Sequence, residues 1–160
     1  MKCVLNKYRE MARHINKKIK IQKDTDWLSY QNEKIIGIPR AVAEQGEKEF
    51  LQSIEKQLPA EEKDLINIIP DFMWSFLHEV GHIEKGTIYH DSLIRGFANM
   101  LGRLGLYRIA NAIYFNLKEE VTATKWAVDY AISHKDLVGK YSWELCKTYK
   151  RYYKSMNLED

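Results

Sequence analysis

The spacing of apolar residues divides the chain into two parts. Over residues 4–16, apolar side chains recur at steps of three and four, which is the period of one face of an amphipathic helix. The period then changes to two, and short apolar runs follow between turn residues, which predicts strands. The expected strands cover residues 18–22, 27–30 and 34–38, with Pro39 at the end of the last one.

From about Glu44 onward the chain shows only the helical period. Together with the short strands before it, this predicts an α+β fold in which a small N-terminal sheet packs on a mostly helical remainder. The sequence contains no repeat, low-complexity tract or linker, so residues 1–160 are expected to form a single domain. The expected helices cover residues 47–57, 61–69 (helix or turn), 71–85 with Gly86 as its stop, 92–104, 107–133 (one helix or two) and 142–156.

Composition narrows the class of protein. The chain has 160 residues, of which 45% are hydrophobic and 12% aromatic, and its net charge of +3 is small, so intrinsic disorder is not expected. Cys3 and Cys146 lie far apart and are interpreted as free thiols, which argues against a disulfide-bonded scaffold and a cysteine-rich zinc module. No apolar run suits a signal peptide or a membrane helix, so we expect a cytoplasmic protein without a membrane partner.

The sequence H-E-x-x-H at positions 78–82 is the strongest chemical signal in the chain. His78 and His82 are four residues apart, so they share one helix face and can take two positions of a tetrahedral zinc ion. Glu79 lies beside the pair, where its carboxylate can take a proton from water during attack on a carbonyl. The alternative interpretation is two helix histidines near a carboxylate with no metal. The apolar helix around the motif favours the metal site.

A zinc site needs a third protein ligand, and the sequence offers two kinds. In the extended motif H-E-x-x-H-x-x-G-x-x-H a glycine and a third histidine follow at fixed spacing, but Gly86 and His90 each come too late. His90 remains a less favoured ligand or a group on the substrate side. The other kind is a carboxylate on a later helix, for which Glu120 is the candidate. Ala123 and Ala127 share its helix face, and small residues there let this helix approach the histidine helix closely.

The H-E-x-x-H motif and the later pattern Glu120-x-x-Ala123-x-x-Trp126-Ala127 together resemble zinc metallopeptidases with a downstream glutamate ligand. Most similar are the compact ImmA/IrrE-like peptidase domains of bacteria, phages and mobile elements, and the resemblance covers residues 15–133. It implies a zincin-like fold with the H-E-x-x-H motif on a central helix, Zn²⁺ as the cofactor and a protein or peptide as the substrate. By position it implies that the metal ligands are His78, His82 and Glu120, and that the general base is Glu79.

One position departs from the pattern of that family. Four residues after the glutamate ligand the family usually has Asn or Asp, which can orient a ligand histidine, whereas this chain has Thr124. The threonine hydroxyl can still accept a hydrogen bond, and Asp91 or Asp129 are alternatives for the same task. Zinc peptidases also usually have a Tyr, His or Arg near the metal that stabilises the developing oxyanion. The candidates for this role are Tyr89, His90 and Tyr114.

Charge is unevenly distributed along the chain. The first 23 residues hold eight Lys and Arg against one Glu, and residues 147–154 interleave basic and aromatic side chains. Either end can bind the phosphates and bases of a nucleic acid, but solvated faces of amphipathic helices explain the same patterns more simply. Residues 44–64 hold seven acids against three bases, so a protein partner is a further interpretation.

The sequence thus supports one leading function and two alternatives. The leading hypothesis is a zinc-dependent metalloprotease that hydrolyses peptide bonds with a metal-activated water and Glu79 as the general base. The main alternative is a non-enzymatic protein-interaction module on the same zincin-like scaffold, for example one encoded by a phage or mobile element. Nucleic-acid binding through the basic ends is the weaker alternative. The pattern specifies no oligomeric state.

Overall fold

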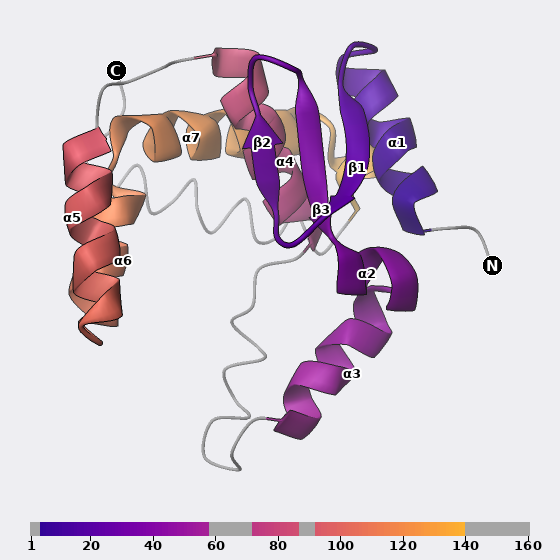
Figure 1. Cartoon of the computed structure of the whole chain (residues 1–160). Coiled ribbons are helices and arrows are strands. Elements are labelled where there is room, and N and C mark those ends of the chain that lie inside the picture. The colour runs from indigo at the N-terminus through magenta and orange to yellow at the C-terminus, as the bar shows by residue number, and fades with distance from the viewer. Residues whose placement is uncertain (1–3, 58–71, 87–91, 140–160) are drawn as a thin grey trace.

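The computed structural model describes residues 4–57, 72–86 and 92–139, and it has an α+β fold (Figure 1). A three-stranded sheet is followed by a mostly helical remainder, as the sequence predicts. The predicted segments 61–69 and 142–156 lie outside the described residues. The elements are α1 (Val4–Ile15), β1 (Lys20–Asp24), β2 (Leu28–Tyr30), β3 (Ile35–Pro39), α2 (Arg40–Gln45), α3 (Glu47–Gln57), α4 (Phe72–Lys85), α5 (Ser92–Arg103), α6 (Tyr107–Phe115), α7 (Lys118–Ser133) and α8 (Lys135–Val138).

The sheet has the strand order β1-β3-β2, so β3 is central and β2 forms an edge. β1 runs parallel to β3, and β2 runs antiparallel to it. The central strand is the most buried, and its Ile36 and Ile38 are fully buried. β1 begins at Lys20, later than predicted, because the Ile19 amide donates to the Asn16 carbonyl and closes a turn between α1 and the strand.

One hydrophobic core joins α1, the sheet, α4 and α7. Tyr8 of α1 is fully buried in it, and its ring centroid lies 5.5 Å from that of Trp27 and 5.2 Å from that of Phe76. The Tyr8 hydroxyl donates to Glu47 at the start of α3, so this polar group has a partner. The amphipathic pattern of residues 4–16 therefore provides a helix whose apolar face covers part of the sheet.

α4 and α7 pack directly on each other (Figure 1). A Cβ atom at Gly81 would lie 2.4 Å from the carbonyl oxygen of Ala123 and 2.9 Å from its Cα, so only glycine fits at this crossing. Ala123 and Ala127 are buried on the same face of α7 as Glu120. The expectation that small residues allow a close approach of the two helices is confirmed.

The helices after the sheet end mostly where the sequence predicts. Gly86, with φ of 56°, follows the last residue of α4. The predicted stretch 107–133 consists of two helices, α6 and α7, interrupted at Asn116 and Leu117. α2 and α8 are not predicted by the pattern, because helices of six and four residues are too short to show a helical period. None of the described helices is both long and apolar enough to cross a membrane.

Ion pairs connect the basic N-terminal part with the acidic segment that follows the sheet. Lys7 Nζ lies 3.2 Å from a Glu47 oxygen, and Lys23 Nζ lies 3.0 Å from a Glu44 oxygen. Solvent-exposed pairs of this kind contribute about 0–1 kcal/mol each to stability. Part of the uneven charge distribution is therefore balanced within the chain itself.

Candidate metal centre

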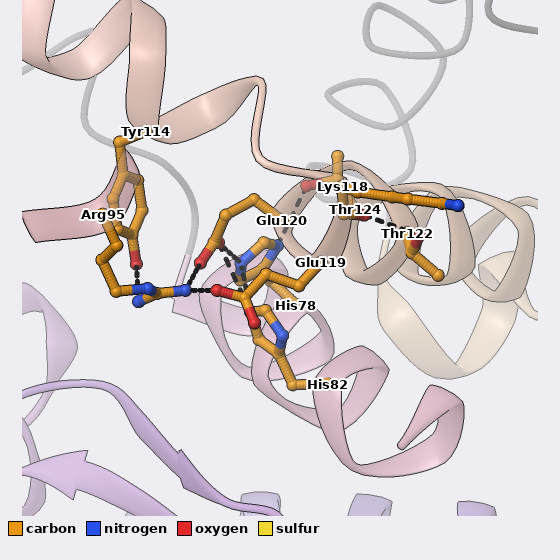
Figure 2. Close-up of polar contacts among 9 residues, drawn as sticks. All are labelled: His78, His82, Arg95, Tyr114, Lys118, Glu119, Glu120, Thr122 and Thr124. Carbon is orange, nitrogen blue, oxygen red and sulfur yellow. Dashed lines mark hydrogen bonds and ion pairs between the residues drawn. The ribbon is translucent and has the colours of Figure 1, made fainter. Parts of the chain in front are cut away.

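His78 and His82 lie one turn apart on α4 and point to the same side (Figure 2). α4 is held in place because apolar side chains such as Phe76, Leu77 and Val80 are fully buried on its other faces. The two Nε2 atoms are 3.1 Å apart, and the planes of the two rings meet at 89°. The side chains of His82 and His78 are 9% and 16% exposed, so the pair is largely but not completely shielded from solvent.

Glu120 of α7 completes a group of three converging side chains. Its Oε2 lies 3.0 Å from His78 Nε2 and 3.4 Å from His82 Nε2. The residue is 2% exposed, and the close crossing of α4 and α7 brings it to the histidines. The three residues predicted as ligands are therefore together in space. Within residues 4–57, 72–86 and 92–139 they are the one set of three such side chains that converges in this way.

The spacing of these atoms suits a metal ion. Zinc binds imidazole nitrogen and carboxylate oxygen at about 2.0–2.2 Å, so neighbouring ligand atoms of a tetrahedral site lie roughly 3.3–3.5 Å apart. The three separations are 3.0, 3.1 and 3.4 Å. The 3.4 Å separation already has the tetrahedral value, and a small outward movement of His78 brings the two shorter ones to it. This buried His-His-Glu group can hold a metal ion.

The negative charge on Glu120 is stabilised by its neighbours. Burial by itself favours the neutral acid and raises the pKa of this carboxyl group. Hydrogen bonds with His78 and His82, together with the attraction of their positive charge, outweigh burial and hold the pKa well below its usual range. Glu120 is therefore a carboxylate at neutral pH, which is the form that binds a metal ion.

Thr124 contacts His78 on the side of the ring away from Glu120. Its Oγ1 lies 3.0 Å from His78 Nδ1. When Nδ1 carries the proton and donates it to this oxygen, Nε2 keeps its lone pair for a metal. The hydroxyl thus occupies the place where the family pattern has Asn or Asp. Of the two alternatives, Asp129 is exposed and Asp91 lies outside the described residues.

Arg95 of α5 meets Glu120 on the side away from the histidines (Figure 2). Its Nη2 donates to Glu120 Oε1 at 3.0 Å and also pairs with Glu119. Its Nη1 donates to the Tyr114 hydroxyl at 3.3 Å. Burial and the negative charge of Glu120 raise the pKa of Tyr114 to about 12, so the phenol stays protonated. Sequence reasoning missed Arg95 and Glu119, because no fixed spacing links α5 to the ligand helices and Glu119 has no motif of its own.

A cleft of about 370 Å³ opens beside the three converging side chains. Residues 27–29 and Gln31, on and around the edge strand β2, form one wall. Arg95 and Tyr114 of the α5–α6 hairpin contribute to the other, and Glu79, the predicted general base, lines the same cleft. A larger hollow of about 810 Å³ runs along another face of α7, but none of the three converging side chains lines it. Of these two hollows among the described residues, the smaller cleft is the one that His82 and Glu120 line.

The three candidates for stabilising an oxyanion differ in their positions. Tyr114 lies in the wall of the cleft, with its hydroxyl bonded to Arg95. Tyr89 and His90 lie outside the described residues. Tyr114 is thus the candidate whose protonated phenol can donate a hydrogen bond beside the ligand group.

Comparisons with known protein families, with curated proteins and with solved structures found no match. The resemblance to ImmA/IrrE-like peptidases is therefore carried by the motif residues on α4 and α7 alone. Function has to be inferred from the chemistry of the converging side chains and of the cleft beside them.

Proposed function

We propose that this chain is a zinc-dependent metallopeptidase with a zincin-like fold, similar to the ImmA/IrrE-like peptidase domains. One observation carries the proposal: His78, His82 and Glu120 each offer a ligand atom, and these atoms all lie within 4.8 Å of one another. The group lies beside a cleft that Glu79 lines. A ligand group of this kind, a neighbouring carboxylate and an accessible cleft are the three parts that metal-assisted hydrolysis requires.

Zinc is the metal that this donor set fits best. Two imidazole nitrogens and one carboxylate oxygen are the ligands of many catalytic zinc sites, in which the fourth position is left to water or substrate. No cysteine belongs to the converging group, which argues against a closed structural site. When bound, zinc polarises the scissile carbonyl and lowers the pKa of the attacking water.

The side chains of the chain itself supply the proton transfers. Glu79 takes a proton from the attacking water and passes it to the leaving amine, as a general base and then a general acid. Tyr114, whose pKa is raised to about 12, remains a donor at neutral pH and hydrogen-bonds the developing oxyanion. Both residues line the cleft, which supports these roles.

The substrate in this proposal is an extended peptide. β2 is an edge strand that pairs with β3, and its residues Leu28 and Ser29 line the cleft. A peptide that adds to such an edge forms main-chain hydrogen bonds with it and runs past the catalytic groups. Leu28, which lines the cleft and is 39% exposed, is available to contact its side chains.

Metal analysis tests whether the chain binds zinc. Purified wild-type protein is expected to bind a single zinc ion per chain, whereas His78→Ala loses a ligand and is expected to bind little or none. Circular dichroism of the two proteins checks that both are folded. Absence of zinc from wild-type protein incubated with excess zinc would contradict the proposal.

Cleavage of an unbiased peptide library, read by mass spectrometry, tests whether the chain hydrolyses peptide bonds with Glu79 as the general base. Glu79→Gln is expected to keep zinc and to lose about 10²–10⁴-fold in cleavage rate, because the amide cannot accept the proton. Glu84→Gln is the matched control, since Glu84 lies on the same helix and is exposed, and it is expected to cleave like wild type. Equal cleavage by wild type and Glu79→Gln would exclude the proposed mechanism.

A non-enzymatic interaction module is the second candidate, and one observation favours it. The α5–α6 hairpin exposes large apolar side chains, among them Leu93, which is 86% exposed. Contiguous exposed apolar surface often marks a protein-binding site. This candidate predicts that biological activity survives Glu79→Gln but is lost when two exposed residues are replaced by serine, Phe97 on α5 and Leu104 directly after it.

A further inference from the structure

The two carboxylate oxygens of Glu120 have different partners. Oε2 faces His78 and His82, with separations of 3.0 and 3.4 Å from their Nε2 atoms. Oε1 accepts a hydrogen bond from Arg95 Nη2 at 3.0 Å. One oxygen is thus directed to the metal-binding group and the other is already bound by a cation from a different helix.

Arg95 is itself held on several sides (Figure 2). Its guanidinium pairs with Glu119 and donates to the Tyr114 hydroxyl, and its central carbon lies 5.0 Å from the centroid of the Tyr114 ring. The Arg95 side chain is 37% exposed, but its partners Glu119 and Glu120 leave only 13% and 3% of their side chains exposed, so the carboxylate side of these contacts is shielded from water. A guanidinium with this many partners has little freedom to release Oε1.

A glutamate ligand can bind a metal through one oxygen or through both. Binding through both adds a fourth protein contact to the two histidines, so the fourth position is no longer open and water can bind only as a fifth ligand. We propose that Arg95 is a positioning residue that keeps Glu120 as a one-oxygen ligand, through Oε2, and so leaves a position open for water. This inference rests on the proposed zinc site and identifies the group that sets its coordination number.

The geometry of arginine is important for this task. Its guanidinium presents several N–H donors in a fixed plane, so it can hold Glu120, Glu119 and the Tyr114 hydroxyl at the same time. Lysine has a single ammonium at the end of a flexible stem and cannot reproduce this arrangement. Arg95→Lys is therefore expected to have a Co²⁺ spectrum and a zinc affinity between those of wild type and Arg95→Ala.

Cobalt substitution tests the proposal without any assay of activity. The visible absorption of Co²⁺ is intense in a four-coordinate site and weaker when a fifth ligand is added. Arg95→Ala is expected to give a weaker, shifted Co²⁺ spectrum and roughly 10-fold lower zinc affinity in competition with a chelator. Arg103→Ala is the matched control, because Arg103 is an exposed arginine on the same helix, and it is expected to match wild type.

The outcomes separate this inference from the proposed function. If wild-type protein takes up neither zinc nor cobalt, the proposed function itself is wrong. If wild type binds both and Arg95→Ala has the same affinity and spectrum, only the role of Arg95 is overturned. If Arg95→Ala does not fold, Arg95→Lys provides the comparison, and an unchanged spectrum in that variant overturns the role as well.

Added guanidinium ion distinguishes positioning from simple packing. If Arg95 acts through its hydrogen bonds to Glu120, guanidinium at non-denaturing concentration should bind in the vacated space of Arg95→Ala and restore the wild-type Co²⁺ spectrum. A loss of affinity with no spectral change and no rescue would show that Arg95 only anchors α5, which would overturn the proposal.

Discussion

Thr124 gives His78 an uncharged hydrogen-bond acceptor. The ImmA/IrrE-like peptidases, which the two sequence motifs resemble, usually have Asn or Asp at this position. The contact between Thr124 Oγ1 and His78 Nδ1 is 3.0 Å long, so the geometry of this interaction is kept. A hydroxyl polarises the imidazole less than a carboxylate does, and the partner of a ligand histidine affects metal affinity. The structure therefore orients His78 with a hydrogen bond to a hydroxyl that carries no charge.

Thr124→Val is expected to weaken zinc binding about 10-fold, because valine has the shape of threonine but cannot accept the Nδ1 proton. Chelator competition measures the affinity. Thr122→Val is the matched control on the same helix: the Thr122 hydroxyl donates to the Lys118 carbonyl, away from the histidines, so this variant should bind zinc like wild type. Equal affinities for the two variants would show that Thr124 has no role at the centre.

Tyr114 is expected to titrate with a pKa of about 12, above the value of about 10 for an unperturbed tyrosine, because burial and the charge of Glu120 disfavour the phenolate. Because the pKa is higher in the folded chain, the neutral phenol contributes to the free energy of unfolding. This contribution is fully present below about pH 10 and is lost as the pH rises through 12. Absorbance of tyrosinate in metal-free wild type minus Tyr114→Phe isolates this one group. A difference curve with a midpoint near pH 10 would contradict the described environment.

Single residues differ in how far the sequence could identify them. His78, Glu79 and His82 are predictable because the chemistry and the helical period act within one turn. Glu120 is predictable only with the small residues that follow it, since its distance along the chain from the histidines follows no geometric rule. Arg95 was not predictable, because an arginine on an amphipathic helix is usually solvated and only the folded chain brings it to Glu120.

At the level of elements, the distance between α4 and α7 determines whether a centre exists. Each helix carries part of the ligand group, and the helices touch at Gly81 and Ala123. The atoms that a Cβ at Gly81 would meet belong to the backbone of α7, which cannot move aside like a flexible side chain. Any added volume at this point therefore separates Glu120 from the histidines.

Gly81→Ala is expected to destabilise the fold by about 1–3 kcal/mol through overpacking, and to weaken zinc binding as well. Urea unfolding and chelator competition measure the two effects. Gly96→Ala is the matched control, since Gly96 lies within α5 and a Cβ built on it meets nothing within 4 Å beyond its chain neighbours and the backbone of its own helix. It should stabilise the chain by about 0.5–1 kcal/mol. A neutral Gly81→Ala would mean that α4 and α7 are not in this close contact.

The elements themselves were largely predictable, but their arrangement was not. The helix α3 agrees with the predicted range of residues 47–57, because its period and its flanking residues are local signals. The strand order β1-β3-β2 has no local signal: β1 pairs in parallel with β3, and that pairing depends on contacts across the sheet and with α1. The edge position of β2, which forms the wall of the cleft, therefore became visible only in the structure.

For the whole molecule, the proposed function predicts that zinc acts as a stabilising ligand, because its ligand group exists only in the folded arrangement of α4 and α7 and not in the separated helices. At a free concentration 100 times the Kd, a ligand adds about 2.7 kcal/mol to the free energy of unfolding. For a chain of 160 residues this corresponds to a rise in Tm of about 5–10 °C. His78→Ala, scanned with and without zinc, is the control, and an equal rise in that variant would place the binding elsewhere.

The separation of the ligands along the chain also determines the order in which the centre is assembled. His78 and His82 come together as soon as α4 forms, whereas Glu120 is 42 positions from His78 and arrives only when α7 docks. Closing so large a segment is a late, entropically costly event compared with forming one helix. A chain emerging from the ribosome therefore presents two imidazoles before it presents the carboxylate. Under the proposed function, tight capture of zinc has to wait for this docking, and the rate of capture during refolding then reports when the two helices meet.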